Sequence, residues 1–115
     1  WVDDRPMNNE AEREAFEALG IQIVLATTTE DAMRALQERR FDLVISDMGR
    51  PPDERAGYTL LSKMKEKSMR VPLLIYAAGG NMPAHRAEAL NRGAVGSTNG
   101  ATELFELALK TLGAL

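Results

Sequence analysis

Residues 41–47 read Phe-Asp-Leu-Val-Ile-Ser-Asp, and this segment decides the fold. Leu43, Val44 and Ile45 form an unbroken apolar run rather than an alternating one, which is typical of a strand that is covered on both faces. A parallel sheet with helices on both sides provides such cover. Asp47 follows the run after one residue, so we expect its carboxylate at the carboxyl edge of a central strand.

The rest of the chain alternates short apolar runs with helical patterns. Four further strands are expected, at Trp1-Val2, Ile21–Leu25, Val71–Ala77 and Ala94–Ser97. Helices are expected over 9–19, 28–39, from Gly57, over 83–92 and from Leu104 to Leu115. Asn9 and Glu12 have the spacing of a capping box, which predicts that the Asn9 side chain caps the first helix.

This order of elements is a (βα)5 string. Right-handed crossovers turn such a string into a doubly wound parallel sheet with helices on both faces, which is an α/β fold. Strand order 2-1-3-4-5 makes the first and third strands neighbours beside the switch point, where open α/β sheets bind ligands. We expect a single domain over residues 1–115.

Three aspartates follow strands that this order places side by side. Asp3 and Asp4 come directly after Trp1-Val2, and Asp47 comes after residues 43–46. Because the carboxyl ends of parallel strands meet at one edge, the three carboxylates should converge there. A group of carboxylate oxygens favours a hard cation such as Mg²⁺.

Composition narrows the classes of function. The 115 residues contain no cysteine, which excludes disulfides and thiolate zinc sites. The net charge is −3, basic residues are scattered and only 5% of residues are aromatic, so we expect no nucleic-acid binding by this domain. No apolar stretch approaches the roughly 20 residues of a membrane span, so we expect a soluble, cytoplasmic domain. Because the chain opens without methionine at the end of a strand, we also expect that residues precede Trp1 in the full protein.

Several motifs occur in a fixed order along the chain. They are Asp3-Asp4, Asp47 after Leu-Val-Ile-Ser, Pro51, Gly-Tyr-Thr-Leu-Leu at 57–61, Val-Pro-Leu-Leu-Ile at 71–75 and Gly93-Ala94 before a short strand. In this order and spacing the chain resembles, from end to end, the receiver domain of two-component response regulators. The resemblance implies a flavodoxin-like fold.

The resemblance also implies a function. Asp47 would accept a phosphoryl group from a histidine kinase or phosphotransfer protein. Asp4, Asp47 and the main-chain carbonyl of Gly49 would hold Mg²⁺, with Asp3 acting through water. The domain would catalyse at most its own phosphorylation and dephosphorylation. Similar receivers dimerise or dock outputs through the surface formed here by residues 83–92, 94–97 and the last helix.

The chain departs from the receiver pattern at the residues that normally contact the phosphoryl group. Ala77 stands where receivers have a serine or threonine, Gly100 where they have a lysine, and Ser97 where they have the switch aromatic. Two extra residues lie between Pro51 and Gly57. The main-chain amides of Ala78, Gly79 and Gly80 are candidates to replace the lost donors, because amides in a glycine-rich turn can cradle a phosphate; alternatively, this turn is simply a flexible loop.

Two hypotheses follow. The first is an atypical receiver that is phosphorylated on Asp47 with Mg²⁺ and signals through a protein interface. The second is a pseudo-receiver, an interaction module that works without phosphorylation. A metal-dependent phosphatase or NTPase is disfavoured, because there is no Walker loop and Gly49 stands where a general acid would be. We expect His85 to be an exposed surface residue, and Arg50 to be either a solvated loop charge or a guide for the phosphodonor.

Overall fold

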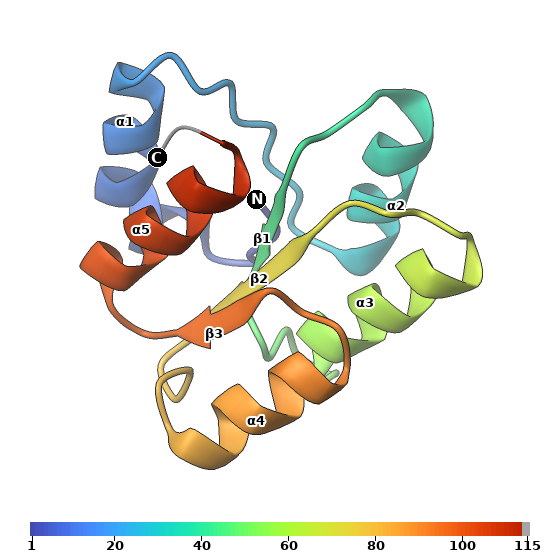
Figure 1. The fold of residues 1–115 in the computed structure, drawn as a ribbon. Helices are drawn as coiled ribbons and strands as arrows, with labels where there is room; N and C mark the ends of the chain where they lie inside the picture. The colour runs from blue at the N-terminus through green and yellow to red at the C-terminus, as the bar shows by residue number, and fades with distance from the viewer. Residues whose placement is uncertain (114–115) are drawn as a thin grey trace.

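A computed structural model describes residues 1–113 of the chain (Figure 1). Its helices are η1 (a 3-10 turn, Pro6–Asn9), α1 (Glu10–Ala18), α2 (Thr29–Glu38), α3 (Ala56–Glu66), α4 (Pro83–Asn91) and α5 (Ala101–Thr111). Its strands are β1 (Val44–Ser46), β2 (Leu73–Tyr76) and β3 (Gly96–Thr98). The expectation for the last helix extended to Leu115, which lies outside the described residues. The 3-10 turn was not predicted.

The three strands form a parallel sheet in the order β1-β2-β3. This confirms the parallel α/β fold and the order of the last three expected strands. The prediction of regular strands at Trp1-Val2 and Ile21–Leu25 is wrong. Val2 forms only isolated parallel bridges, to Ala26 on one side and to Ser46 on the other. Val2 thus lies between Ala26 and Ser46, where the expected strand order places it.

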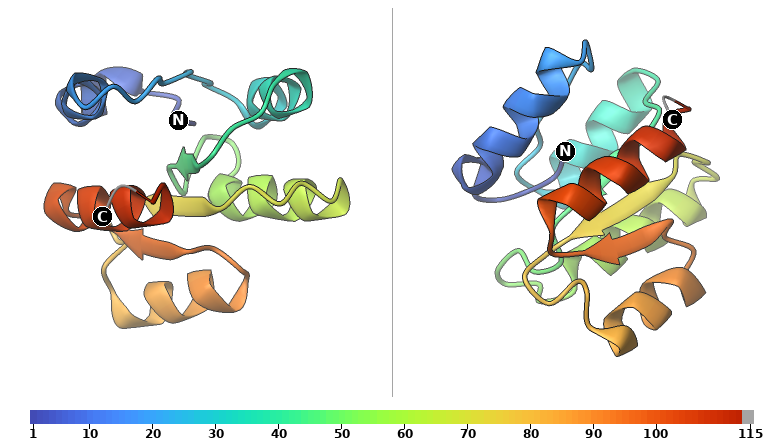
Figure 2. Two further views of the ribbon diagram at one scale, coloured as in Figure 1. Left: turned by 45° about the horizontal axis from the view of Figure 1, so that its top comes forward. Right: turned by 60° about the vertical axis from the view of Figure 1, so that its left-hand side comes forward.

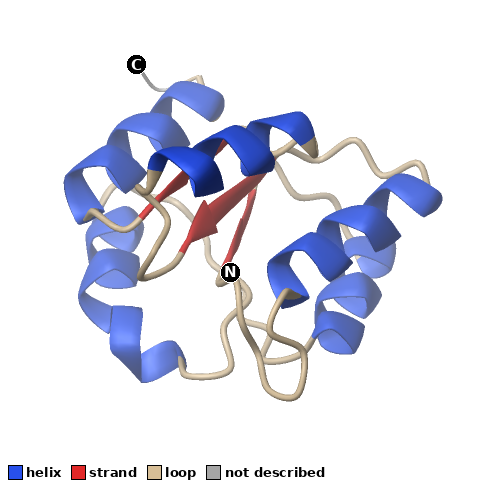
Figure 3. Ribbon diagram, turned by 90° about the horizontal axis from the view of Figure 1, so that it is seen from below, coloured by secondary structure: helices blue, strands red, loops and turns tan. Residues whose placement is uncertain are grey.

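Helices cover both faces of the sheet (Figures 1 and 2). Val44, Leu73 and Ile75 pack with the buried side chains of α2, α3 and α4. Ile45 and Leu74, which alternate with them along the strands, pack with α1 and α5. Successive strand residues point to opposite faces, so the side chains of an unbroken apolar run pack against the helices on both faces of the sheet. Viewed from below, the strands lie innermost between these helices (Figure 3).

Helices α1 to α4 occur within one or two residues of their expected ends, whereas α5 begins three residues before the expected start at Leu104. Thr28 begins α2 as an N-cap, with its Oγ1 accepting a hydrogen bond from the Asp31 amide at 3.0 Å. Pro83 lies in the first turn of α4, where its missing N–H costs nothing. No helix among residues 1–113 is both long and apolar enough to cross a membrane.

Two glycines allow backbone segments to approach each other closely. A Cβ on Gly57, in the first turn of α3, would lie 2.6 Å from the carbonyl oxygen of Asp47 and 2.9 Å from Cδ1 of Ile75. A Cβ on Gly80 would lie 2.3 Å from the carbonyl oxygen of Thr98. The Gly79-Gly80 turn therefore packs against β3, and the expectation of a merely flexible loop is wrong for Gly80, which is buried.

Candidate functional site

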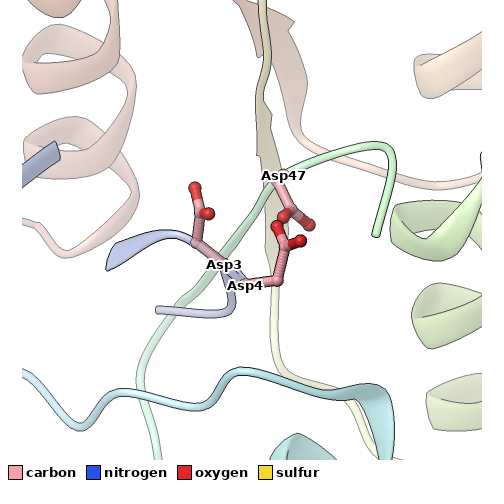
Figure 4. Close-up of side chains that lie close together, drawn as sticks. All are labelled: Asp3, Asp4 and Asp47. Carbon is pink, nitrogen blue, oxygen red and sulfur yellow. The ribbon is translucent and has the colours of Figure 1, made fainter. Parts of the chain in front are cut away.

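The carboxylates of Asp3, Asp4 and Asp47 lie together at the carboxyl edge of the sheet. Each offers one ligand atom, and these atoms all lie within 4.8 Å of one another. The bridges of Val2 produce this arrangement, since the Asp47 amide donates to the Val2 carbonyl at 3.0 Å. Figure 4 shows the Asp4 and Asp47 carboxylates pointing toward each other, with the Asp3 carboxylate turned to another side.

The three aspartates line a pocket of about 480 Å³. Its wall also contains Gly49 and Pro51 from the loop after β1. The structure therefore brings together the predicted metal-ligating residues Asp3, Asp4, Asp47 and Gly49.

Asp3 is held by its neighbours. Its Oδ1 accepts from the Arg5 amide at 2.7 Å, and its Oδ2 accepts from Nδ2 of Asn9 at 2.9 Å. Asn9 also accepts a bond from Nε of Arg13 at 3.2 Å. The prediction that Asn9 caps α1 with its side chain is wrong, because these two charged partners engage the amide group instead.

Arg50 pairs with Asp47 inside the protein. Its side chain is only 5% exposed, and its Nη1 donates to Oδ1 of Asp47. Both expectations for Arg50, a solvated loop charge or a guide for an incoming phosphodonor, are therefore wrong. The carboxylate draws the guanidinium inward, where further acceptors satisfy it.

The two oxygens of Asp47 have different surroundings. Oδ1 is bound by Arg50, whereas Oδ2 is buried and has no hydrogen-bond partner among the described residues. Burial raises the pKa of Asp47 from 3.8 to about 6, although the charge of Arg50 acts in the opposite direction. The Asp3 carboxylate adds to the rise. A further negative charge at this site is therefore unfavourable unless a cation neutralises it.

These features fit a divalent cation. An unpartnered buried carboxylate oxygen is costly unless it gains a donor or a metal ion. Asp47 supplies such an oxygen, and the exposed carboxylate of Asp4 points toward the Asp47 carboxylate (Figure 4). Both carboxylate oxygens of Asp3 already accept hydrogen bonds, so contact with the ion through water suits Asp3 better than direct ligation. Oxygen ligands with waters retained are what Mg²⁺ requires.

The opposite wall of the pocket includes Ala77, Ala78 and Asn99. Ala77 offers no hydroxyl, and its amide donates to the Thr98 carbonyl within the sheet at 3.1 Å. Ala78 does line the pocket, as predicted for a phosphate-contacting amide, but Gly79 does not. Asn99 lines it too, with its Nδ2 donating to the Ala78 carbonyl at 3.2 Å.

Three other residues singled out from the sequence, Gly100, Ser97 and His85, lie away from the pocket, as does Thr98. Thr98 is buried, and its Oγ1 accepts from the Gly100 amide at 3.1 Å. Gly100 itself is the N-cap residue of α5. Ser97 is buried in β3. His85 is exposed, as expected, with Nδ1 2.8 Å from the Gly79 carbonyl oxygen.

The loop with the two extra residues folds into a tight turn. Main-chain bonds of 2.8 Å join Arg50 and Asp53 in both directions, and the peptide bond between Pro51 and Pro52 inside the turn is cis. This turn carries Pro51 to the rim of the pocket while the Arg50 side chain enters the protein.

Sequence reasoning named Arg50 and Asn9 but missed these contacts, and it did not name Thr29. No local pattern marks them, because the partners of Arg50 come from segments as much as 21 positions away. The one sequence feature that points to the ion pair is the position of Arg50, three residues after Asp47.

Comparison with known proteins agrees with this geometry. The family model of the response regulator receiver domain matches residues 1–99. The sensor histidine kinase RcsC of Escherichia coli (strain K12) is 29% identical over 73 residues, which are 64% of this chain. The match spans 8% of the length of that kinase.

Solved structures share the fold. The receiver domain of NtrX from Brucella abortus has a TM-score of 0.80 at 22% identity, covering 99% of this chain and 97% of that one. The chemotaxis response regulator CheY4 of Vibrio cholerae has a TM-score of 0.77 at 20% identity, covering 96% and 93%. The fold is thus flavodoxin-like. The chain belongs to the response regulator receiver domain family of two-component signalling.

Proposed function

We propose that this receiver domain accepts a phosphoryl group on Asp47 from a histidine kinase or phosphotransfer protein, in a reaction that depends on Mg²⁺. Asp4, Asp47 and the Gly49 carbonyl would hold the ion, with Asp3 acting through water. The observation that carries the proposal is the buried, unpartnered Oδ2 of Asp47 in a pocket shared with two other carboxylates.

The chemistry requires little of the protein beyond position and charge. An oxygen of Asp47 attacks the phosphorus of a phosphohistidine donor. The new O–P bond forms as the N–P bond breaks, the electron pair stays on the imidazole nitrogen, and solvent supplies the proton that this ring then takes up. A bound divalent cation offsets the charge of the carboxylates and the phosphoryl oxygens.

The pocket wall supplies donors for the phosphoryl oxygens in place of the missing side chains. The Ala78 amide is the principal candidate, because Ala78 lines the pocket and its amide donates to none of the described residues. Gly79 lies outside the pocket wall, so its amide is the weaker candidate.

Incubation with acetyl phosphate and Mg²⁺, followed by intact-mass measurement, tests the assignment. The wild-type chain should gain one phosphoryl group, and Asp47→Asn should gain none. Asp42→Asn is the matched control, since it makes the same change of charge at an exposed aspartate and should leave the gain intact. Chelation of the metal should suppress the gain in the wild type and in Asp42→Asn.

A wild-type chain that gains no mass with acetyl phosphate or with a phosphorylated kinase would contradict the proposal. That result would favour the second hypothesis, an interaction module that works without phosphorylation.

We further propose that α4, β3 and α5 form the surface for signalling, including dimerisation. Arg86 of α4 and Glu103 of α5 form a bidentate ion pair with bonds of 3.1 and 2.7 Å, which ties the two helices together. Leu90 lies one helical turn after Arg86 and is 58% exposed. An exposed leucine beside this ion pair supports a protein contact there.

A further inference from the structure

We propose that Arg50 is the positioning residue of Asp47. It is a built-in counter-ion that holds Oδ1, leaves Oδ2 without a hydrogen-bond partner among residues 1–113 and lowers the affinity of the site for a divalent cation. This inference rests on the proposed function of the same site, but it can be tested without any phosphoryl donor.

Four acceptors fix the guanidinium. Nη1 donates to Oδ1 of Asp47 and to Oγ of Ser46 at 3.1 Å. Nη2 donates to Oγ1 of Thr29 at 2.7 Å and to the carbonyl of Ala56 at 3.2 Å. The acceptors belong to the end of β1, the first turn of α2 and the first turn of α3, so the planar fork cannot turn without breaking bonds in three elements.

Arg50 does not stand in for the lysine that receivers have at the position of Gly100. It is absent from the lining of the acidic pocket, and its partners lie on the side of α2 and α3. Its side chain is 5% exposed, so it cannot reach a group in the pocket without giving up these bonds. It acts through Asp47 instead.

The consequence for the site is electrostatic. A cation in the pocket would meet three negative charges, on Asp3, Asp4 and Asp47. The positive charge of Arg50 reduces the net charge from −3 to −2. A unit charge and a divalent ion about 6 Å apart repel each other enough to change the affinity about tenfold, even at the permittivity of water. Arg50 also makes the position of Asp47 independent of a bound ion.

Isothermal titration of the full chain with Mg²⁺ alone tests this inference. Arg50→Met should bind Mg²⁺ about tenfold or more tightly than the wild type, because the repulsion is removed. Arg50→Lys keeps the charge and should stay within about threefold of the wild type. Arg34→Met is the matched control, since it removes an exposed arginine that pairs with Asp31, and its affinity should not change.

Other outcomes also decide the question. If Arg50→Met unfolds without metal but folds with Mg²⁺, the ion has replaced the missing counter-ion, which supports the inference. If the wild type binds no Mg²⁺, binding gained in Arg50→Met supports it equally. Three results would overturn the inference. Arg50→Met could bind Mg²⁺ no more tightly than the wild type, or it could stay unfolded even with Mg²⁺. Arg50→Lys could also bind Mg²⁺ as tightly as Arg50→Met. Because no phosphate is present, failure of Asp47 phosphorylation would leave this readout intact.

Discussion

At Asp47, burial and ion pairing act in opposite directions. The carboxylate lies inside the protein with one oxygen on Arg50 and the other without a partner. Burial outweighs the pairing, since the pKa of Asp47 is raised to about 6. Ionisation of Asp47 therefore costs more free energy in the folded protein than in the unfolded chain. Such a shifted pKa is typical of groups at functional sites rather than of groups that stabilise the fold.

The first prediction concerns stability against pH without divalent cations. A carboxyl group whose pKa is raised by folding stabilises the protein below its unfolded pKa, near 4, and this stability is lost as the pH rises through about 6. The loss amounts to about 3 kcal/mol at pH 7. Asp47→Asn, which cannot ionise, should therefore exceed the wild type in free energy of unfolding by about that amount at pH 7.

Urea denaturation in chelator at pH 4 and at pH 7 measures the difference, which should nearly vanish at pH 4. Asp42→Asn serves as the exposed control and should match the wild type at both pH values. The same gap between Asp47→Asn and the wild type at both pH values would show that ionisation of Asp47 is not its cause.

The start of α3 is packed directly against the end of β1 and the residues that follow it. The Gly57 amide donates to the Met48 carbonyl at 2.9 Å, and its Cα faces the Asp47 carbonyl and the side chain of Ile75. In the adjacent turn, the Ala56 carbonyl accepts from Arg50. The helix therefore positions Asp47 through its main chain and Arg50 through its first carbonyl.

Accordingly, Gly57→Ala should destabilise the protein by about 1 to 3 kcal/mol, the usual cost of overpacking a core. The new methyl group would lie 2.6 Å from a main-chain oxygen, so α3 must shift away from β1. Thermal denaturation compares it with Gly100→Ala, where the nearest atom to the new Cβ is 3.9 Å away. Gly100→Ala should change stability by less than about 0.5 kcal/mol; equal effects of the two substitutions would refute close packing at Gly57.

Across the molecule, the pocket and the proposed signalling surface are joined by β3 and the turns that flank it. Asn99 follows β3 and lines the pocket wall, and Arg86 and Glu103 connect the helices that precede and follow that strand. Gly80, packed on the Thr98 carbonyl, ties the turn after β2 to the same strand. A change in the pocket therefore has a short, packed route to α4 and α5.

If these helices form the dimer surface, Leu90→Glu should weaken self-association. Sedimentation with Mg²⁺ and beryllofluoride, a mimic of the phosphoryl group, should show a dimer for the wild type and a dissociation constant about tenfold or more weaker for the variant, since a buried charge is costly at an interface. Leu19→Glu is the control, because Leu19 is 62% exposed at the end of α1. A dimer that is weakened only by Leu19→Glu would place the interface on the other face.

Much of the fold could be predicted from short-range patterns. Helical spacing located α1 through α5, and the apolar runs located β1, β2 and β3, because side-chain periodicity depends only on local geometry. The regular strands expected at Trp1-Val2 and Ile21–Leu25 are not formed, since strand pairing depends on contacts between distant segments, which no local pattern contains. The capping role of Asn9 failed for a related reason: Asp3 and Arg13 engage its side chain.

The aspartates show where sequence alone is sufficient. Asp47 follows β1, and Asp3 and Asp4 follow Val2, which bridges in parallel to Ser46. Parallel segments end at one edge, so the predicted order of strands is enough to bring the three aspartates together. Arg50 shows where it is not. Whether a loop arginine points to solvent or inward depends on acceptors from Thr29, Ser46 and Ala56, which meet only after α2, β1 and α3 have packed. A charge is buried only where the surrounding groups can replace water, and that condition belongs to the packed structure.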